Sequence, residues 1–224
     1  TGAHMLCFSQ YGEGLNEHCP ALLSDIPVKN TLGDVIAAAG LSQLRIAETE
    51  KYNHVTYFMD AERTIDFDGE EKVLIDSPDV ATFDMKPEMS ANEITAALLP
   101  RLAKFDVVLM NFANGDMVGH TGNEKATIAA MECLDKQLSQ IVPAVLKLGG
   151  QMLIIADHGN AETMWDDKNN TPWTAHTNNK VRAILVSKPK YKKIKNGGLA
   201  DVAPTLLKLL GIKQPKDMTG KSLV

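Results

Sequence analysis

The chain has 224 residues, of which 28 are acidic and 23 are basic, and its formal net charge is −5. Hydrophobic residues make up 44% and charged residues 23%, a globular composition that supplies a core and excludes intrinsic disorder. The length suits one sizeable domain or two small ones. The excess of acidic residues argues against a protein that binds nucleic acids or anionic membranes non-specifically. Apolar runs fall short of the ~20 residues of a membrane-spanning helix, so we expect a soluble protein.

The cysteines and the first residues indicate the cellular compartment. Cys7, Cys19 and Cys133 are an odd number without Cys-x-x-Cys spacing, which favours neither a disulfide framework nor a thiolate zinc site. A reducing compartment, the cytoplasm, fits best. Residues 1–5 lack the regions of a signal peptide and are typical of the remnant of a cleaved expression tag. Lysines gather in residues 188–195, which we interpret as a solvated loop rather than a nucleic-acid site.

The first regular element is predicted after an irregular segment, residues 6–29, that glycine and proline interrupt. Apolar residues at helical spacing predict a helix over residues 32–39, which ends where Gly40 offers a left-handed cap. Runs of β-branched, aromatic and other apolar residues then predict short strands. These strand candidates are residues 45–47, 55–58 and 73–75.

A helix, a strand and a longer helix are predicted next. Ser90 and Glu93 have the spacing of a capping box, which predicts that a helix begins there. Residues 106–111 contain four consecutive apolar residues and predict a strand buried on both faces of a parallel sheet. A long helix is predicted from about Glu124, with a buried stripe on one face. The predicted stripe consists of Ile128, Met131, Leu134, Leu138, Ile141 and Val145.

The last part of the chain repeats this alternation. A glycine pair at residues 149–150 ends the long helix and leads into a second apolar strand at residues 152–156. Strand, helix and strand at this spacing predict a βαβ unit. A third strand is predicted at residues 181–186, and a final helix begins near Asp201 and stops at Gly211. The pattern as a whole indicates an α/β fold.

Side chains of the types that bind metal ions follow the two apolar strands. Asp116 and His120 come after the first strand, at the i, i+4 spacing that puts both on one face of a helical turn. Asp157 and His158 come after the second strand and can converge only if the strand ends before them. His176 lies in the loop ahead of the third strand. The carboxyl ends of parallel strands form the usual ligand edge of such sheets, so we expect these side chains to meet there.

The types of donor indicate the chemistry of this site. Imidazole and carboxylate ligands without a thiolate suit Mn²⁺, Zn²⁺ or iron rather than Ca²⁺. Two such ions about 3.5–4 Å apart would clamp the attacking and leaving oxygens of a phosphoryl transfer. Each pair of donors alone is common by chance as a helix cap or a surface imidazole. The gathering of three histidines in glycine-rich turns favours a site, and phosphoryl transfer is the leading reaction class.

Three segments surround these candidate ligands: Asn-Gly-Asp-Met-Val-Gly-His-Thr-Gly-Asn at residues 114–123, Ala-Asp-His-Gly-Asn-Ala-Glu at residues 156–162 and Thr-Ala-His-Thr at residues 174–177. They closely resemble the cofactor-independent, or 2,3-bisphosphoglycerate-independent, phosphoglycerate mutase family. The likeness extends from about residue 30 to residue 224. It implies the α/β fold of the alkaline-phosphatase superfamily, with a mostly parallel sheet and helices on both faces. Residues 45–52, 86–91 and 199–205 add further support.

The resemblance also implies an activity and a set of site residues. Members of this family are glycolytic isomerases that interconvert 3- and 2-phosphoglycerate through a phosphoserine at a two-manganese site, without 2,3-bisphosphoglycerate. The resemblance implies that Lys51 helps to hold the phosphoryl group; the alternative is a surface ammonium. For the complete protein we expect a cytoplasmic monomer whose partner is a small phosphoglycerate, with no nucleic acid or membrane. The implied ligands are Asp116, His120 and His176 for one ion, and Asp157 and His158 for the other.

Three departures from the family pattern are visible. One is that Gly115 stands where proline is common in the family. No segment matches the motif of the nucleophilic serine or the inserted substrate-binding domain, so residues 6–224 resemble the C-terminal part of the phosphatase domain. We therefore expect negligible mutase turnover from this chain alone, and self-association through apolar surface that the missing parts would cover. In addition, residues 59–63 stand where the family is usually rich in glycine.

Two other functions are compatible with the same residues. One is a broader phosphatase or a phosphopentomutase-like member of the same superfamily. The segments around Lys51 and Lys86 argue against it, because they resemble the phosphoglycerate mutase sequences. The other is a non-catalytic module that binds a metal ion or a partner. Activity of a complete protein on phosphopentoses rather than phosphoglycerates would favour the first alternative.

Overall fold

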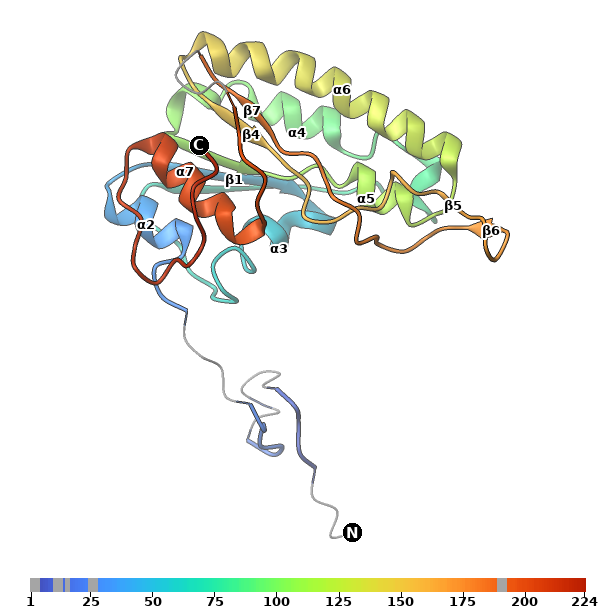
Figure 1. Cartoon of the computed structure of the whole chain (residues 1–224), viewed down its shortest axis with the longest axis horizontal. Helices are drawn as coiled ribbons and strands as arrows, with labels where there is room; N and C mark the ends of the chain where they lie inside the picture. Colours follow the sequence, from blue (N-terminus) through green and yellow to red (C-terminus); the bar gives the residue numbers. More distant parts are fainter. Residues whose placement is uncertain (1–4, 10–13, 15–16, 24–27, 189–192) are drawn as a thin grey trace.

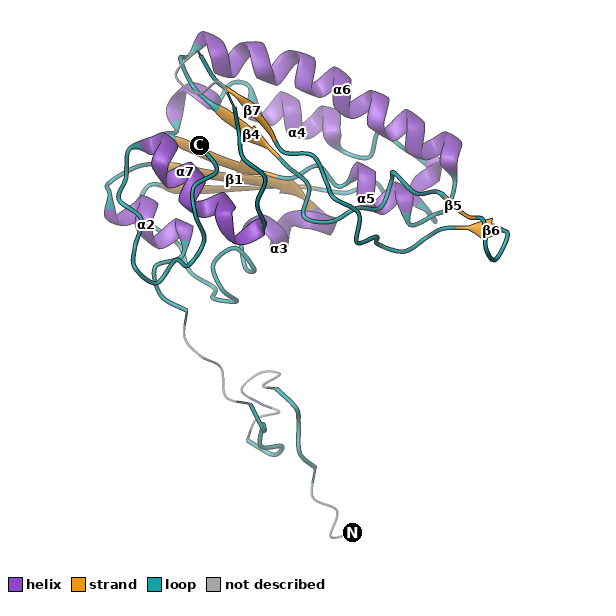
Figure 2. Ribbon diagram, viewed as in Figure 1, coloured by secondary structure: helices purple, strands orange, loops and turns teal. Residues whose placement is uncertain are grey.

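Strands and helices alternate along most of the chain (Figures 1 and 2). The computed structural model describes residues 5–9, 14, 17–23, 28–188 and 193–224. In this part the helices are α2 (Leu32–Ala38), α3 (Tyr52–Val55), α4 (Ala91–Leu98), α5 (Asn114–Gly119), α6 (Glu124–Lys147) and α7 (Val202–Leu210). The strands are β1 (Gln43–Glu48), β2 (Glu70–Ile75), β3 (Val107–Met110), β4 (Met152–Ile154), β5 (Trp165–Asp166), β6 (Thr171–Pro172) and β7 (Ile184–Val186).

A three-stranded parallel sheet with the order β2-β1-β3 lies at the centre of the fold. Gln43 of β1 stands opposite Glu70 of β2 on one side and Val107 of β3 on the other. All six residues of β1 are buried, because this strand has a neighbour at each edge and a layer of helices on each face. The strands predicted at residues 45–47, 73–75 and 106–111 are therefore confirmed.

Helices cover both faces of this sheet (Figure 2). On one face, Leu44 and Ile46 pack against Ile94 of α4 and Ile141 of α6. On the other face, α2 and α7 pack together around Val107. Because successive side chains of a strand point to opposite faces, Leu44 and Ile46 of β1 lie in the first layer, whereas Gln43 and Arg45 lie on the second face. The predicted α/β fold with helices on both faces is confirmed.

Strand β4 pairs with β7 in an antiparallel arrangement, with Met152 opposite Val186. Within the described residues, β3 and β4 belong to different sheets, so the predicted βαβ unit is wrong as a hydrogen-bonded pair of parallel strands. Helix α6 leads the chain into β4, which pairs with β7 on one side. The strands predicted at residues 152–156 and 181–186 are both present but shorter.

The strand predicted at residues 55–58 is wrong, because the chain there ends a helical turn. Val55 is the last residue of α3, and its carbonyl accepts a hydrogen bond from Arg45 at 2.8 Å. The hydroxyl of Thr56 donates to the carbonyl of Tyr52 at 2.8 Å. The polar groups of this segment thus form hydrogen bonds within the turn and with a buried arginine rather than with a neighbouring strand. These contacts outweigh the preference of β-branched and aromatic residues for strands.

The predicted capping box at Ser90 is also wrong, although α4 begins at the expected place. The hydroxyl of Ser90 donates to the carbonyl of Asp76 at 2.7 Å instead of capping the helix. A capping box is present at α2, where the Thr31 hydroxyl accepts from the backbone N–H of Asp34 and the Asp34 carboxylate accepts from the backbone N–H of Thr31. The tertiary contact with Asp76 thus takes the Ser90 hydroxyl away from the end of α4.

The buried stripe predicted on α6 is wrong in its first half. Ile128 is 54% exposed and Met131 is 45% exposed. The small side chains of Ala126 and Ala130 are buried instead, against Val118 of α5. Two alanines let α5 approach α6 closely, and this contact turns the larger apolar side chains of α6 outward.

Residues 59–63, where glycine is expected, include two residues in the left-handed region. Ala61 has a φ of 59° and Glu62 a φ of 61°. Left-handed backbone costs a residue with a Cβ about 1–2 kcal/mol, whereas glycine adopts it freely. We expect Ala61→Gly to stabilise the protein by about 1 kcal/mol in urea unfolding. The matched change Ala37→Gly in α2 should destabilise it by a similar amount; destabilisation by both changes would contradict the argument.

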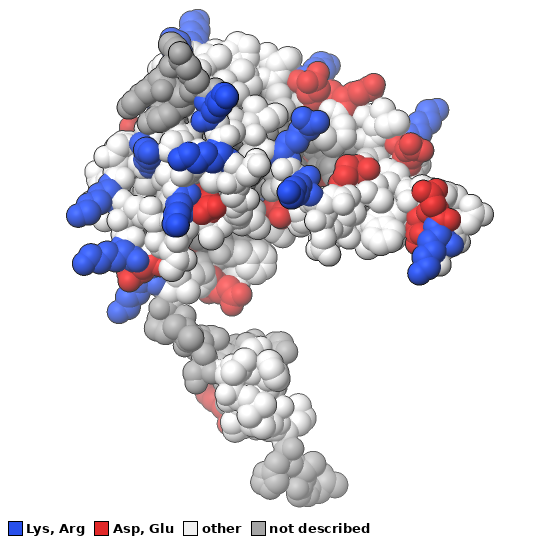
Figure 3. All heavy atoms as spheres, viewed as in Figure 1, with Lys and Arg blue, Asp and Glu red and all other residues white. Residues whose placement is uncertain are grey.

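Three predicted segments fall partly outside the described residues. They are the tag remnant, the irregular segment and the lysine-rich run, of which residues 1–4, then residues 10–13, 15–16 and 24–27, and residues 189–192, respectively, are not described. Among the described residues, none of the helices has the length and apolar character needed to cross a bilayer. On the face shown in Figure 3, basic side chains predominate around α2 and α7, whereas acidic and basic side chains lie side by side at the β5–β6 hairpin.

Candidate metal centre

Helix α5 begins four residues after β3 ends and presents the first two candidate ligands. Asp116 lies in its first turn, and His120 is its C-terminal cap, with a backbone hydrogen bond of 3.0 Å from the His120 amide to the Asp116 carbonyl. This turn places the Nε2 atom of His120 at 3.0 Å from the Oδ1 atom of Asp116. The two side chains share a face, as their spacing predicts.

His176 completes a triangle of donor atoms. Its Nε2 atom lies 3.0 Å from Oδ1 of Asp116 and 3.0 Å from Nε2 of His120. The three residues come from α5 and from the loop that precedes β7, more than 50 residues further along the chain. They form a group whose candidate ligand atoms all lie within 4.8 Å of one another.

A hydrogen bond fixes the orientation of the His120 ring. Its Nδ1 atom lies 2.7 Å from the carbonyl oxygen of Thr174, which can only accept, so Nδ1 carries the proton. The Nε2 atom of the neutral ring then directs its lone pair at the triangle. Histidines that bind metal ions commonly donate their other ring nitrogen in this way. Because Thr174 is two residues from His176, this bond also connects α5, which carries Asp116 and His120, to the loop that carries His176.

Asp157 and His158 lie beside this triangle. Strand β4 ends at Ile154, so both side chains lie beyond the strand and can turn to the same side. The Nε2 atom of His158 is 3.5 Å from Oδ2 of Asp157 and 4.0 Å from Oδ1 of Asp116. Its ring stacks on that of His176 with centroids 3.6 Å apart. The structure thus brings all five predicted ligands together.

Lys51 reaches the same site from the sheet. It ends the 3-10 turn Thr49–Lys51 that follows β1, and it is only 8% exposed. Its ammonium donates a hydrogen bond to Oδ2 of Asp116, the oxygen that does not face the histidines. The interpretation of Lys51 as a surface ammonium is therefore wrong, and its charge is part of the site.

The surroundings of Asp116 favour its ionised form. Burial by itself would raise the pKa of this carboxyl, but hydrogen bonds from Lys51 and Asn160 and the charge of Lys51 outweigh it. Together they lower the pKa from 3.8 to about 2. Asp116 is therefore an anion under all ordinary conditions, as a metal ligand must be.

This pKa predicts how acid affects the ion-free protein. Because the folded-state value lies below 3.8, the stabilisation is complete above about pH 4 and is lost as the pH falls toward about 2. We expect a loss of about 1–2 kcal/mol from this carboxyl, measured by urea unfolding in EDTA. Lys51→Met should reduce the loss by removing the main cation. Equal acid sensitivity of the variant and the wild type would contradict this assignment.

Two residues near the site were not found by sequence reasoning. Asn160 is 4% exposed, and its amide donates to Oδ1 of Asp116 at 2.8 Å. It fits under α5 because a Cβ at Gly119 would lie 2.4 Å from its Oδ1. His54 faces the same region: burial and the nearby charge of Lys51 lower the pKa of its imidazole, while Asp157 opposes this. The sequence signal that could have found His54 is its position three residues after Lys51, which puts the two on the same side of a helical turn.

The triangle suits a divalent transition-metal ion. Bonds of imidazole and carboxylate to such an ion are about 2.0–2.2 Å long, which puts neighbouring ligand atoms about 3 Å apart. The three edges of the triangle have this length. In addition, a lone pair of His120 and a carboxylate oxygen face each other, an arrangement that a cation between them would stabilise. Donor chemistry and geometry therefore fit a bound ion.

Comparison with known proteins gives consistent results. The family model of the metalloenzyme superfamily matches residues 19–214. The 2,3-bisphosphoglycerate-independent phosphoglycerate mutase 1 of Methanosarcina acetivorans is 49% identical over 223 residues, which are 99% of this chain and 43% of that protein. The corresponding mutase of Synechococcus sp. (strain JA-3-3Ab) is 53% identical over 204 residues, 86% of this chain and 38% of that protein.

A solved structure shows the same similarity. The crystal structure of Leishmania mexicana phosphoglycerate mutase at low cobalt concentration matches with a TM-score of 0.84 and 31% sequence identity. The match covers 97% of this chain and 43% of that one. The chain thus spans about two fifths of the length of the relatives it matches.

Proposed function

The chain belongs to the metalloenzyme superfamily, and we propose that it is the metal-binding part of a 2,3-bisphosphoglycerate-independent phosphoglycerate mutase. The observation that carries this proposal is the triangle of Asp116, His120 and His176 with the ammonium of Lys51 at its edge. A cation site beside a buried lysine is suited to a phosphoryl group, which carries negative charge on several oxygens. The small-molecule partner would be a phosphoglycerate, and the compartment the cytoplasm.

We assign the ligands to two ions, in the family's case manganese, with other divalent ions as possible substitutes. Bound there, such ions would polarise a phosphoryl oxygen and neutralise its charge. The first ion would be held by three side chains of this chain, and the second by two, so we expect the second to bind more weakly. The first set is Asp116, His120 and His176, and the second is Asp157 and His158.

Lys51 has a distinct role in this proposal. An ammonium has three protons, and Asp116 accepts one of them. The remaining protons are available to donate to a phosphoryl oxygen, while the bond to Asp116 keeps the flexible side chain in place. Burial strengthens this interaction because the surrounding dielectric is lower than that of water. Lys51 thereby contributes both orientation and charge.

The proposal can be tested in a chimera. In the Methanosarcina relative, the matching segment is replaced by this chain, and conversion of 3- to 2-phosphoglycerate is assayed with Mn²⁺ present. We expect an active chimera whose kcat/KM falls by at least about 100-fold on Lys51→Ala, because a charge-stabilising donor is lost. Lys213→Ala, on the segment after α7, is the control and should leave the activity unchanged.

Specific outcomes would contradict the proposal. A chimera that is folded and contains Mn²⁺ but turns over no phosphoglycerate would exclude this chain from mutase function. Turnover of phosphopentoses in preference to phosphoglycerates would favour the phosphopentomutase-like alternative. A folded chimera that binds no divalent ion would contradict the metal assignment itself.

A further inference from the structure

One carboxylate joins the two loops that carry His158 and His176. The hydroxyl of Thr177 and the amide of Asn179, the latter at 2.9 Å, both donate to Oε1 of Glu162. From the other loop, the backbone N–H of Asn160 donates to Oε2 of Glu162 at 2.7 Å. Glu162 therefore accepts three hydrogen bonds, and its donors come from both sides of the junction. We call this arrangement the Glu162 clamp.

The two loops meet at close range beside the clamp. Gly159 and Thr177 form an antiparallel bridge, in which the N–H of Thr177 donates to the Gly159 carbonyl at 2.9 Å. A Cβ at Gly159 would lie 2.3 Å from the Thr177 hydroxyl and 2.4 Å from Oε1 of Glu162. The junction thus leaves no room for a side chain, and the carboxylate lies directly against the backbone.

The clamp is connected to three side chains of the metal centre, two through neighbouring residues and one through a hydrogen bond. Gly159 adjoins His158, and Thr177 adjoins His176, whose rings stack with centroids 3.6 Å apart. Asn160, whose N–H is held by Glu162, uses its side chain to donate to Asp116. A shift of either loop would therefore change the separation of the donor atoms.

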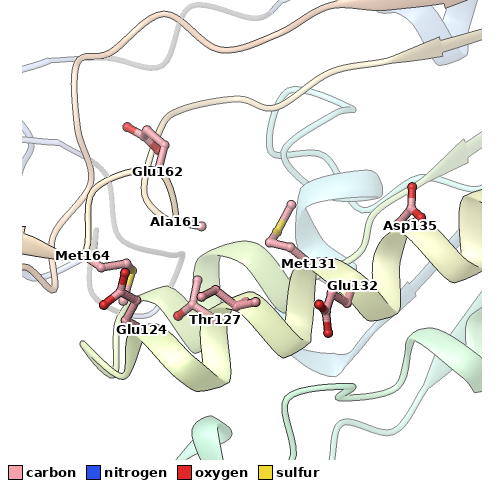
Figure 4. Close-up of a pocket in the computed structure, with 9 residues that line it drawn as sticks. Glu124, Thr127, Met131, Glu132, Asp135, Ala161, Glu162 and Met164 are labelled. Carbon is pink, nitrogen blue, oxygen red and sulfur yellow. The ribbon is translucent and has the colours of Figure 1, made fainter.

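We propose that Glu162 is a positioning residue of the metal centre, which fixes the separation of the His158 and His176 loops without binding the ion. This inference rests on the proposed metal site. Glu162 is exposed as a residue, yet its carboxylate is taken up by donors of the two loops. Glu162 also lines a groove of about 510 Å³, in which it lies on the loop across from α6 (Figure 4). Acidic residues of α6 line the same groove, but the hydrogen bonds of Glu162 to the two loops give it a different role.

Calorimetric titration with Mn²⁺ tests the proposal. We expect Glu162→Ala to lower the affinity for the first Mn²⁺ by about 10-fold or more with unchanged stoichiometry. Removal of a residue that orients a metal ligand has an effect of this size. Glu162→Gln, which keeps one acceptor oxygen, should recover part of the affinity. Glu132→Ala is the matched control: it removes an exposed carboxylate from the same groove and should leave the affinity unchanged.

Two further measurements separate positioning from general stability. Hydrogen exchange of the ion-free protein should show faster exchange in residues 158–163 and 176–179 of Glu162→Ala, with β1 to β3 unaffected. The visible absorption of bound Co²⁺ should change in Glu162→Ala because its ligand geometry is altered. If Glu162→Ala fails to fold, Thr177→Val and Asn179→Ala each remove one donor of the clamp and serve in its place.

Each outcome has a distinct meaning. Wild-type affinity, Co²⁺ spectrum and exchange in Glu162→Ala would overturn the inference. Loss of a whole equivalent of Mn²⁺ in both Glu162 variants would also overturn it, by making Glu162 a ligand. Absence of Mn²⁺ binding by the wild type would overturn the proposed function, whereas the exchange measurement on ion-free protein would still decide whether Glu162 orders the two loops.

Discussion

Replacing His120 with alanine is expected to weaken binding of the first Mn²⁺ by at least about 100-fold. The change removes one of three donor atoms, and removal of a residue that merely orients a ligand already costs about 10–100-fold. The side chain is 38% exposed, and among the described residues its ring hydrogen-bonds outside the triangle to the Thr174 carbonyl alone, so the fold should tolerate the change. Calorimetric titration gives the affinity and the stoichiometry together.

The control for this experiment is another histidine of the same region. His54→Ala removes an imidazole near Lys51 but no atom of the donor triangle, and should leave Mn²⁺ affinity within about threefold of the wild type. Identical stoichiometry and affinity in His120→Ala and the wild type would remove His120 from the set of ligands.

The second large effect is expected at Arg45, whose side chain is completely buried. Its guanidinium lies 3.1 Å from Asp60 and 3.2 Å from Glu70, and it donates to the Val55 carbonyl. Arg45→Met would leave the buried carboxylate of Asp60 without its cation and Glu70 with Lys72 alone. Loss of one partner of a buried ion pair typically costs about 3–5 kcal/mol. Burial raises the pKa of Asp60 even with Arg45 present, so the uncompensated charge would be unfavourable. Urea unfolding at neutral pH measures the loss.

A partly exposed ion pair provides the comparison. Arg101 contacts Glu71 at 2.8 Å, but the two side chains are 32% and 43% exposed. Arg101→Met should therefore cost less than about 1 kcal/mol. Adding Asp60→Asn to Arg45→Met should restore part of the lost stability by removing one orphaned charge. Equal losses at Arg45 and Arg101 would show that burial does not determine the effect.

Much of the fold could be predicted from local sequence because burial on both faces leaves a clear signal. The apolar run of β3 and the glycine at the end of α7, Gly211 with a φ of 74°, are examples. The failures come from tertiary contacts that act against local preference. Arg45 holds Val55 in a turn, and the Asp76 carbonyl takes the hydroxyl of Ser90 from its helix. No periodicity contains this information.

The five ligand candidates could be found because imidazole and carboxylate side chains gather near strand ends, four of them after β3 and β4 and His176 in the loop ahead of β7. Their assignment to ions stays a prediction, although the structure brings them together. Asn160 and Glu162 could not be found in this way, since an amide and a carboxylate that act through hydrogen bonds have no characteristic spacing. Only the folded loops show that they hold Asp116 and the Thr177 segment in place.

The most direct test of the central claim is anomalous scattering from crystals of this chain grown with Mn²⁺. The predicted result is a peak at the manganese edge within about 2.0–2.3 Å of the Asp116 carboxylate and the Nε2 atoms of His120 and His176. Stoichiometric manganese located elsewhere, with these three side chains apart and without a peak between them, would contradict the claim.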